Sequence, residues 1–362
     1  MAVAVPERSP SMRSRLPDPE RVEPWRDWAI LAFVNHAILL AAAVWRPDWP
    51  WLLALALPLG IGLATATLTV LHDAGHRRFS RRLWPNVLAT QTAAPVGLWV
   101  AYWTLKHRVH HRVTQVYPLD DATRASGLVR LHPSAPRLPV HRFQHIYAWF
   151  LYGLAWVGEL RSQLTYVRTG VLDDVAVPSR SARLRSFSVE KALWLLVLAP
   201  YAVFMGPAKL ALLLVTAMTI ASAWAAVVLA VGHINTGLEP SATAPEGRAA
   251  WTAHLVRTSA SFNTNSRTLW WLTGGLTHHL AHHLRATAAR GELALLHRTT
   301  VAEAVAASGA QLIEYPTLTS AVRGHGQRLR ALGQPGLEPE PSFEAAPALA
   351  VTGGQRARRQ WR

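Results

Sequence analysis

The chain has 362 residues, of which 50% are hydrophobic and only 16% are charged, against roughly a quarter charged in soluble proteins. This composition excludes an ordinary soluble globular protein and indicates a membrane protein. The formal net charge is +16, but the arginines that supply most of it are scattered over loops and tails. We therefore expect an anionic lipid surface, and no nucleic acid, as the partner.

The chain contains no cysteine. Disulfides, thiolate zinc sites and an iron–sulfur cluster within this chain are therefore excluded. If the protein catalyses a redox reaction, its electrons must come from an external donor.

Both ends of the sequence differ in composition from the apolar middle. The first 24 residues mix prolines with Arg and Glu and lack the apolar core of a signal peptide. We interpret residues 1–27 as a disordered cytoplasmic tail. Residues 334–362 turn to Pro, Ala and Glu and end in several arginines, which predicts a second disordered, basic tail. The region 28–333 is expected to form one domain.

Four apolar stretches approach or reach the length of about 20 helical residues that crosses a bilayer. They comprise residues 28–45, 50–71, 189–205 and 209–231. The links between the first two and between the last two are very short, so we expect two antiparallel hairpins. Nearly all Lys and Arg lie in the amino tail, in 72–188 or after 232. The positive-inside rule places these segments in the cytoplasm. The predicted fold is an all-α integral membrane protein, in the bacterial cytoplasmic membrane, with a cytoplasmic helical cap.

Two further apolar stretches, 86–105 and 143–160, are ambiguous because of their length or polarity. If either crossed the bilayer alone, the histidine-rich segments would lie on opposite sides of the membrane. We interpret both as re-entrant or interfacial helices, with tryptophans suited to the depth of the lipid headgroups: Trp99, Trp103, Trp149 and Trp156.

Three histidine clusters lie in the segments expected on the cytoplasmic side. The first has the spacing HxxxH and the other two have the spacing HxxHH. On helices, these spacings place the imidazoles on one face, where they converge on metal. The eight residues are His72, His76, His107, His110, His111, His279, His282 and His283.

Eight imidazoles are enough ligands for two metal ions, whereas a zinc site needs only three or four. Neither HExxH nor Glu-x-x-His occurs, so a zinc protease and a carboxylate-bridged helical bundle do not fit. We therefore expect an all-nitrogen di-iron centre.

Other polar residues are candidates for supporting roles. His233, at the end of the fourth apolar stretch, is the candidate ninth ligand, and His254 is its competitor. His278 is expected to face away from its neighbours on a helix. Three carboxylates are candidates for orienting ligand rings through hydrogen bonds: Asp73, Asp120 and Asp121. His36, within the first stretch, is expected to make a packing hydrogen bond between helices.

These histidine clusters resemble the boxes of the membrane fatty acid desaturase family. The similarity extends to Trp103 before the second box, to Asp120, to 141–147 and to 257–276 before the third. The resemblance covers roughly 28–333 and is strongest to bacterial acyl-lipid and linoleoyl-type members.

The resemblance implies two irons in a cap over four transmembrane helices, with dioxygen as co-substrate and a fatty acyl substrate in a narrow tunnel. It carries over the eight box histidines as metal ligands and matches His233 to an extra ligand at a helix end. It implies a double bond introduced into an acyl chain of a lipid or thioester. No cytochrome b5 motif His-Pro-Gly-Gly occurs, so the electron donor is expected to be a separate ferredoxin-type or cytochrome b5-type protein.

The sequence departs from the family pattern at the third box, where His279 replaces the Gln of one branch and no Phe-Pro follows His283-Leu. Two alternatives stay open. One is a lipid or carotenoid hydroxylase or oxidase of the same superfamily. The other, from a different class, is a membrane metal transporter.

Overall fold

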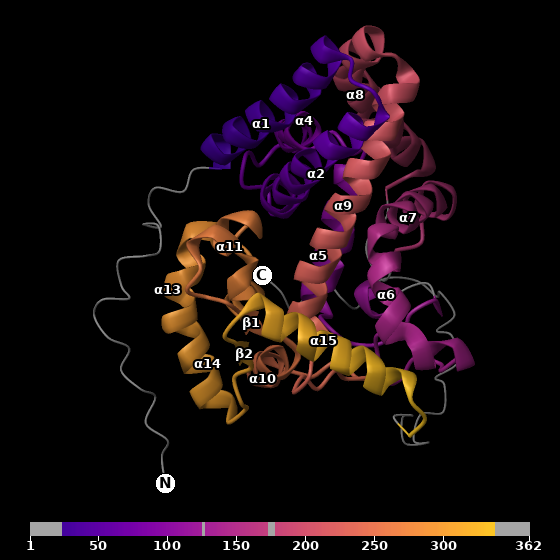
Figure 1. Ribbon diagram of the computed structural model, residues 1–362. Helices are drawn as coiled ribbons and strands as arrows, with labels where there is room; N and C mark the ends of the chain where they lie inside the picture. Colours follow the sequence, from indigo (N-terminus) through magenta and orange to yellow (C-terminus); the bar gives the residue numbers. More distant parts are fainter. Residues whose placement is uncertain (1–23, 125–126, 173–177, 337–362) are drawn as a thin grey trace.

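The computed structural model describes residues 24–124, 127–172 and 178–336. The expected tails lie outside these residues except for 24–27 and 334–336. The described part is almost entirely helical (Figure 1), and its amino-terminal half comprises α1 (Pro24–Trp45), α2 (Trp49–Ala66), the π-helical turn η3 (Thr67–Leu71), α3 (His72–Gly75), α4 (Leu83–Ala93), α5 (Val100–Arg112), the 3-10 turns η4 (Asp121–Thr123) and η6 (Pro139–Phe143), α6 (Gln144–Gly153) and α7 (Ala155–Thr169).

Two long helices open the second half, and short helices follow them. The elements are α8 (Arg180–Met205), α9 (Pro207–His233), α10 (Arg248–Thr258), β1 (Ser261–Phe262), α11 (Arg267–Leu272), η7 (Leu276–His278), α12 (His279–Leu284), η8 (Arg290–Glu292), α13 (Leu293–Arg298), α14 (Thr300–Ser308), β2 (Glu314–Tyr315) and α15 (Leu318–Gly333). The two strands pair in parallel, with Ser261 opposite Glu314.

Four helices of the described residues are long and apolar enough to cross a membrane: Pro24–Trp45, Trp49–Gly75, Arg180–Met205 and Pro207–His233. The prediction of four apolar spans is therefore confirmed. Each helix extends beyond the stretch expected from hydropathy, because helical hydrogen bonding continues into the polar turns that flank an apolar core. The first helix begins at Pro24, within the segment expected as a tail.

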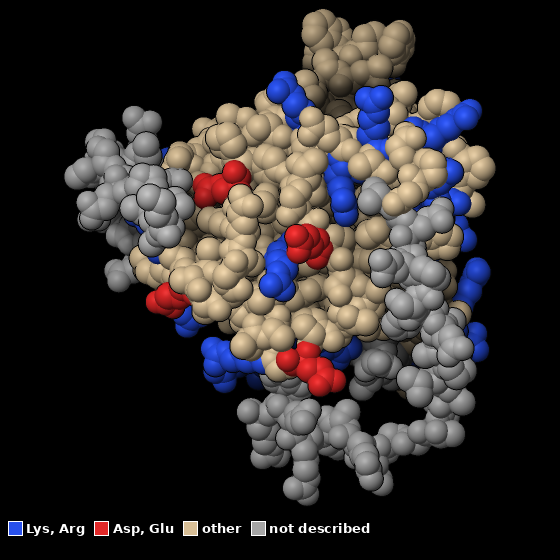
Figure 2. Space-filling model, turned by 90° about the horizontal axis from the view of Figure 1, so that it is seen from below, with Lys and Arg blue, Asp and Glu red and all other residues tan. Residues whose placement is uncertain are grey.

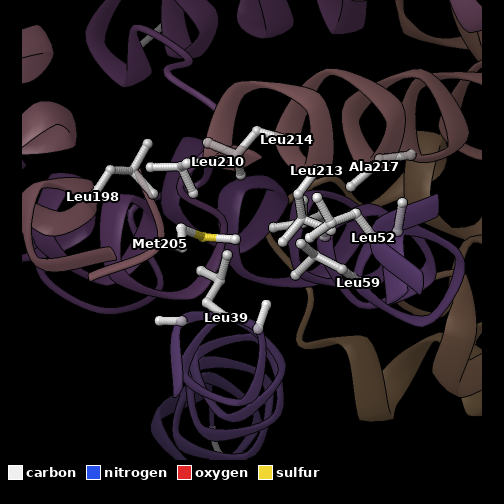
Figure 3. Packing of buried hydrophobic residues seen from close by; sticks show 14 of the residues in the cluster. Leu39, Leu52, Leu59, Leu198, Met205, Leu210, Leu213, Leu214 and Ala217 are labelled. Atoms are coloured by element: carbon white, nitrogen blue, oxygen red, sulfur yellow. The ribbon is translucent and has the colours of Figure 1, made fainter. Parts of the chain in front are cut away.

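The helices α2 and α9 pack closely. At Gly60 of α2, an added Cβ would lie 2.8 Å from the carbonyl oxygen of Ala217 and 2.7 Å from Cβ of Ile220, both on α9. Contacts of this kind between a glycine and a neighbouring backbone are typical of helix pairs in membranes. Leucines from all four long helices fill the space around this pair (Figure 3).

The links between α1 and α2 and between α8 and α9 lie together at one end of the molecule. Lys209 Nζ, at the start of α9, donates to the carbonyl oxygens of Arg46 and Pro47, both at 2.9 Å. Because α2 and α9 both begin at this end, they run in the same direction. Their far ends carry His72 and His233 to the opposite end of the bundle.

The two ambiguous stretches are each broken into shorter helices. Residues 86–105 include the end of α4, a non-helical segment and the start of α5, and 143–160 is divided between α6 and α7. Neither is among the helices long enough to span a membrane. Their position relative to the lipid headgroups stays a prediction.

The carboxyl-terminal helices α10 to α15 pack below the far ends of the long helices (Figure 1). Arg290 fixes this lobe to the bundle. Its buried guanidinium pairs with Asp27 of α1, donates to Thr69 Oγ1 of η3 at 3.4 Å, and lies 4.5 Å from the ring centroid of Trp270.

We predict that Gly60→Ala lowers the thermal stability of the detergent-purified protein. The added methyl group would overlap the backbone of α9, and overpacking of this kind costs about 1–3 kcal/mol. Gly158→Ala is the matched control, because no atom lies within 4 Å of its added Cβ. Equal melting temperatures for the two variants would contradict the close packing of α2 on α9.

Candidate metal centre

Nine histidines converge where α2 and α9 end. The π-helical turn η3 precedes His72 directly, and such turns are frequent at functional sites. The helix α5 contributes three of the histidines, α12 contributes three, and the last residue of α9 contributes one. The structure thus brings together all nine residues that the sequence singled out as ligands.

The histidines form two groups, and each group mixes clusters that are distant in sequence. The first group contains His72, His76, His107, His111 and His282. The second contains His110, His233 and His283, and His279 joins it through contacts between Nε2 atoms of 2.8 Å to His233 and 3.2 Å to His283.

The distances between ring nitrogens in the first group match the spacing around a metal ion. Neighbouring Nε2 atoms lie 3.1 Å apart in His72 and His282, 2.9 Å in His282 and His111, 3.1 Å in His111 and His107, and 3.0 Å in His107 and His76. Two nitrogens at about 2.1 Å from one metal ion and at right angles to each other are separated by about 3.0 Å. The spacing of these nitrogens therefore fits a ligand shell around one metal ion.

In the second group, oxygen atoms fix which ring nitrogen carries the hydrogen. His233 Nδ1 lies 3.0 Å from the carbonyl oxygen of Thr258 and must donate to it. His283 Nδ1 lies 3.3 Å from Thr114 Oγ1, whose own hydrogen is donated to the carbonyl oxygen of His110. His283 therefore also donates from Nδ1.

This assignment leaves a lone pair, without hydrogen, on Nε2 of both His233 and His283. The two Nε2 atoms nevertheless lie 2.9 Å apart. Two facing lone pairs repel each other at this distance, so they cannot form a hydrogen bond. A cation between them turns the repulsion into coordination. The positions of these two nitrogens are therefore better explained by coordination of a metal ion than by direct contact between the rings.

Burial favours the neutral form of the histidines in the first group. It lowers the pKa of His76 to about 4, and the charges of Arg78 and Arg108 add to this effect. Burial also holds the pKa of His107, His111 and His282 well below the ordinary value, and there the neighbouring imidazoles add to the effect. Because neutral imidazole is the form that binds metal, these rings need no deprotonation near pH 7.

Asp120 orients the ring of His110, the kind of role that the sequence suggested for it. Its Oδ2 accepts from His110 Nδ1 at 2.9 Å and from the backbone N–H of Gln115 at 2.8 Å, and its Oδ1 accepts from the backbone N–H of Ala122 at 3.0 Å. Although burial opposes the charged form, the His110 ring and these hydrogen bonds hold the pKa of Asp120 below its usual value. The carboxylate therefore stays ionised and fixes the direction of the His110 ring, whose ligand atom lies within 4.8 Å of those of His233 and His283.

Two of the other candidate residues have different roles. Asp121 pairs with Lys106 at 2.9 Å and with Arg124 at 3.6 Å, and thus makes its ion pairs outside the two groups. Asp73 is buried, and the positive charges of Arg290 and Arg78 act on its carboxylate.

Three histidines outside the two groups have other partners. His254 Nε2 donates to the carbonyl oxygen of Thr114 at 2.7 Å and so supports a residue that orients His283. His278 lies next to Thr277 Oγ1, at 3.1 Å from Nδ1. His36 bridges helices as expected, with Nδ1 at 2.6 Å from the Tyr201 hydroxyl and Nε2 at 2.8 Å from the Thr92 carbonyl oxygen.

Four supporting residues had no assigned role from the sequence: Thr114, Thr258, Gly232 and Trp103. At Gly232, an added Cβ would lie 2.6 Å from the ring of His279, so only glycine leaves room for this ring. Trp103 stacks on His107 with ring centroids 4.5 Å apart. The spacing of four residues between Trp103 and His107 was the one available signal, since it places both on one helix face.

Comparisons with known proteins identify the family. Residues 47–316 match the model of the fatty acid desaturase family, described as fatty acid desaturase. The chain belongs to this family. The match includes all nine histidines, and it confirms the prediction of an enzyme that desaturates fatty acids.

Curated relatives agree with this assignment. The chain is 27% identical over 275 residues to an sn-1 linoleoyl-lipid 6-desaturase of Synechocystis sp., covering 73% of this chain and 75% of the relative. It is 26% identical over 266 residues to the protein of the same name from Arthrospira platensis, covering 70% and 71%. An acyl-lipid (8-3)-desaturase of Physcomitrium patens is 26% identical over 278 residues, or 74% of this chain and 57% of that protein.

We predict that Asp120→Asn weakens metal binding by about 10–100-fold, the usual cost of losing a residue that orients a metal ligand. Both carboxylate oxygens accept hydrogen bonds, so the NH₂ group of Asn must face a donor. Titration of the metal-free protein with Fe²⁺ measures the effect. The control Asp121→Asn removes the same charge one residue away and should bind metal like the wild type. Equal weakening in both variants would contradict a specific role for Asp120.

Proposed function

We propose that this desaturase holds two irons, one in each histidine group. The first iron would be bound by His72, His76, His107, His111 and His282, and the second by His110, His233, His279 and His283. The observation that carries the proposal is the 2.9 Å contact between Nε2 of His233 and of His283, both of which lack a hydrogen at that atom. Imidazole suits iron among other metals, and the family membership favours iron over zinc or copper.

When bound, the iron pair would supply the oxidising power that lets dioxygen take two hydrogens from adjacent methylenes. In the balance of the reaction, the acyl chain loses two hydrogens with their electrons. A donor supplies two more electrons, solvent supplies two protons, and dioxygen becomes two waters. The protein must hold one carbon–carbon bond at the site and exclude water from it.

The protein's residues contribute orientation and neutrality. Asp120, the Thr258 carbonyl and Thr114 Oγ1 fix three of the ligand rings, and Gly232 leaves room for a fourth. Because burial disfavours the charged imidazoles, His279 and His283 would stay neutral while protons are delivered from solvent to the site.

For the substrate, we infer an acyl chain carried by a membrane lipid. The curated relatives are named as desaturases of linoleoyl lipids and acyl lipids. The four helices that are long and apolar enough to cross a bilayer support a substrate drawn from the membrane lipids. A thioester-bound chain is the competing substrate, and the position of the new double bond is open.

The site would face the cytoplasm of a bacterial cytoplasmic membrane. The two short links contribute few charges, whereas the carboxyl-terminal lobe, α10 to α15, carries nine arginines and no lysine. Seen from below, the molecule shows Lys and Arg spread over its surface (Figure 2). By the positive-inside rule, this lobe and the adjoining histidines lie on the cytoplasmic side. An external ferredoxin-type or cytochrome b5-type protein would deliver the electrons there.

A metal transporter fits the structure less well. Transport sites lie near the middle of the bilayer, whereas the two histidine groups lie at the ends of α2 and α9. His36, the histidine within α1, is engaged by Tyr201 and the Thr92 carbonyl. A hydroxylase with the same architecture would differ from a desaturase only in its product. The mass of the product therefore distinguishes the two activities.

We predict that His110→Ala abolishes the product while the protein stays in the membrane, since the four apolar helices insert independently of the site. Expression in a host with deuterated acyl chains, followed by lipid mass spectrometry, measures the product. His145→Ala on α6, outside both groups, is the control and should retain activity. A wild-type product lighter by two hydrogens is expected. A product heavier by one oxygen would identify a hydroxylase, and full activity of His110→Ala would contradict its role as a ligand.

Metal removal provides an independent test. Treatment of the purified enzyme with an iron chelator should abolish desaturation, and Fe²⁺ should restore it while Zn²⁺ does not, because zinc has no accessible redox change. Metal analysis of the restored enzyme should give two irons per chain. One metal per chain, or activity restored by zinc, would contradict the assignment.

A further inference from the structure

An apolar groove opens on the outside of the bundle, between the start of α1 and α4. Its volume is about 420 Å³, within the range of about 300–1,000 Å³ that is typical of ligand pockets. Its main lining residues are Trp25, Trp28, Phe79, Trp84, Pro85 and Leu88. No histidine of the metal centre lines it.

The walls of the groove are held in place without a ligand. Trp28 Nε1 donates to Thr92 Oγ1 at 2.8 Å, which fixes the ring between α1 and α4. Trp25 meets Phe79 edge to face, with centroids 4.9 Å apart. Binding would therefore cost little reorganisation of the protein.

The outer side of the groove is apolar and exposed. Trp84 and Leu88 lie one turn apart on α4 and are 63% and 43% exposed. Phe33 continues this surface along α1 and is 75% exposed. Since α1 is one of the membrane-spanning candidates, this surface faces lipid, and the tryptophans at its end have the position of an aromatic belt.

Two exposed arginines lie in the loop that borders the groove. Arg81 and Arg82 stand between the lining residues Ser80 and Trp84, and both side chains are exposed. The buried Asn86 holds the loop rigid, because its Nδ2 donates to the carbonyl oxygens of Ser80 and Arg82, both at 2.7 Å. The amino-terminal end of α4 adds its partial positive charge at the same place.

We propose that this groove binds one anionic phospholipid of the surrounding bilayer as a resident lipid, distinct from the substrate. An acyl chain would lie against the tryptophans, and Arg81 and Arg82 would bind the phosphate. The groove wall includes Phe79, three residues beyond His76, so the lipid stabilises the loop that follows the first histidine cluster. The proposal does not depend on the identity of the metal or of the product.

Native mass spectrometry of the delipidated, detergent-purified protein tests the proposal, with phosphatidylglycerol and phosphatidylcholine as probes. The wild type should retain one phosphatidylglycerol in preference to phosphatidylcholine. Arg81→Gln/Arg82→Gln should weaken this binding at least about tenfold, since each basic residue near an anionic lipid surface contributes about a factor of five. Leu88→Asp should weaken binding of the lipid's acyl chain. The variant should still fold, because Leu88 is exposed on the surface of the protein.

The matched control is Arg161→Gln/Arg168→Gln, which removes two exposed arginines from α7 and should bind like the wild type. Equal affinity for both lipids, or unchanged binding in the Arg81/Arg82 variant, would overturn the proposal. Displacement of the lipid by inorganic phosphate alone would also overturn it, because it would identify a simple anion site. If a deuterated lipid retained in the groove becomes desaturated in a single turnover, the groove holds substrate and the resident lipid is excluded.

Discussion

The close parallel packing of α2 against α9 is the constraint on which the rest of the structure depends. The two helices start at the same end, where Lys209 joins their links, and the contact at Gly60 sets their separation. A metal centre tolerates errors of only a few tenths of an ångström in its ligands. Two apolar helices that pack closely, with a glycine of one against the backbone of the other, position side chains more precisely than loops would. His72 and His233 therefore occupy fixed positions, and the helices α5 and α12 are arranged around them.

Much of this arrangement could be predicted from the sequence, because it depends on local periodicity. The HxxxH and HxxHH spacings place histidines on one helix face, and apolar length alone located the four long helices. The position of His233 followed from its place at the end of an apolar stretch. Each of these inferences uses residues close together in sequence, for which helix geometry is sufficient.

The division of the histidines into two groups could not be predicted in the same way. His110 and His111 are adjacent in sequence but belong to different groups, because successive residues on a helix point about 100° apart. Which partners they meet depends on how α12 packs against α5, and no spacing encodes this. The same limit applies to Arg290, which joins Asp27 to Thr69 across more than two hundred residues.

The two groups also differ in how their ligands are supported. In the second group, three rings donate N–H to a carboxylate, a carbonyl and a hydroxyl, which raises the basicity of Nε2 and fixes its direction. Both groups also contain a buried Nδ1 without a hydrogen-bond partner, that of His111 in the first group and that of His279 in the second. A metal ion in the second group would therefore be held by three nitrogens of raised basicity and fixed direction. Among the described residues, Asp120 is the carboxylate that bonds to a histidine of the two groups. The charge of a bound metal pair would be compensated mainly on the side of His110, so the two positions would be chemically unequal even though both are lined by imidazoles.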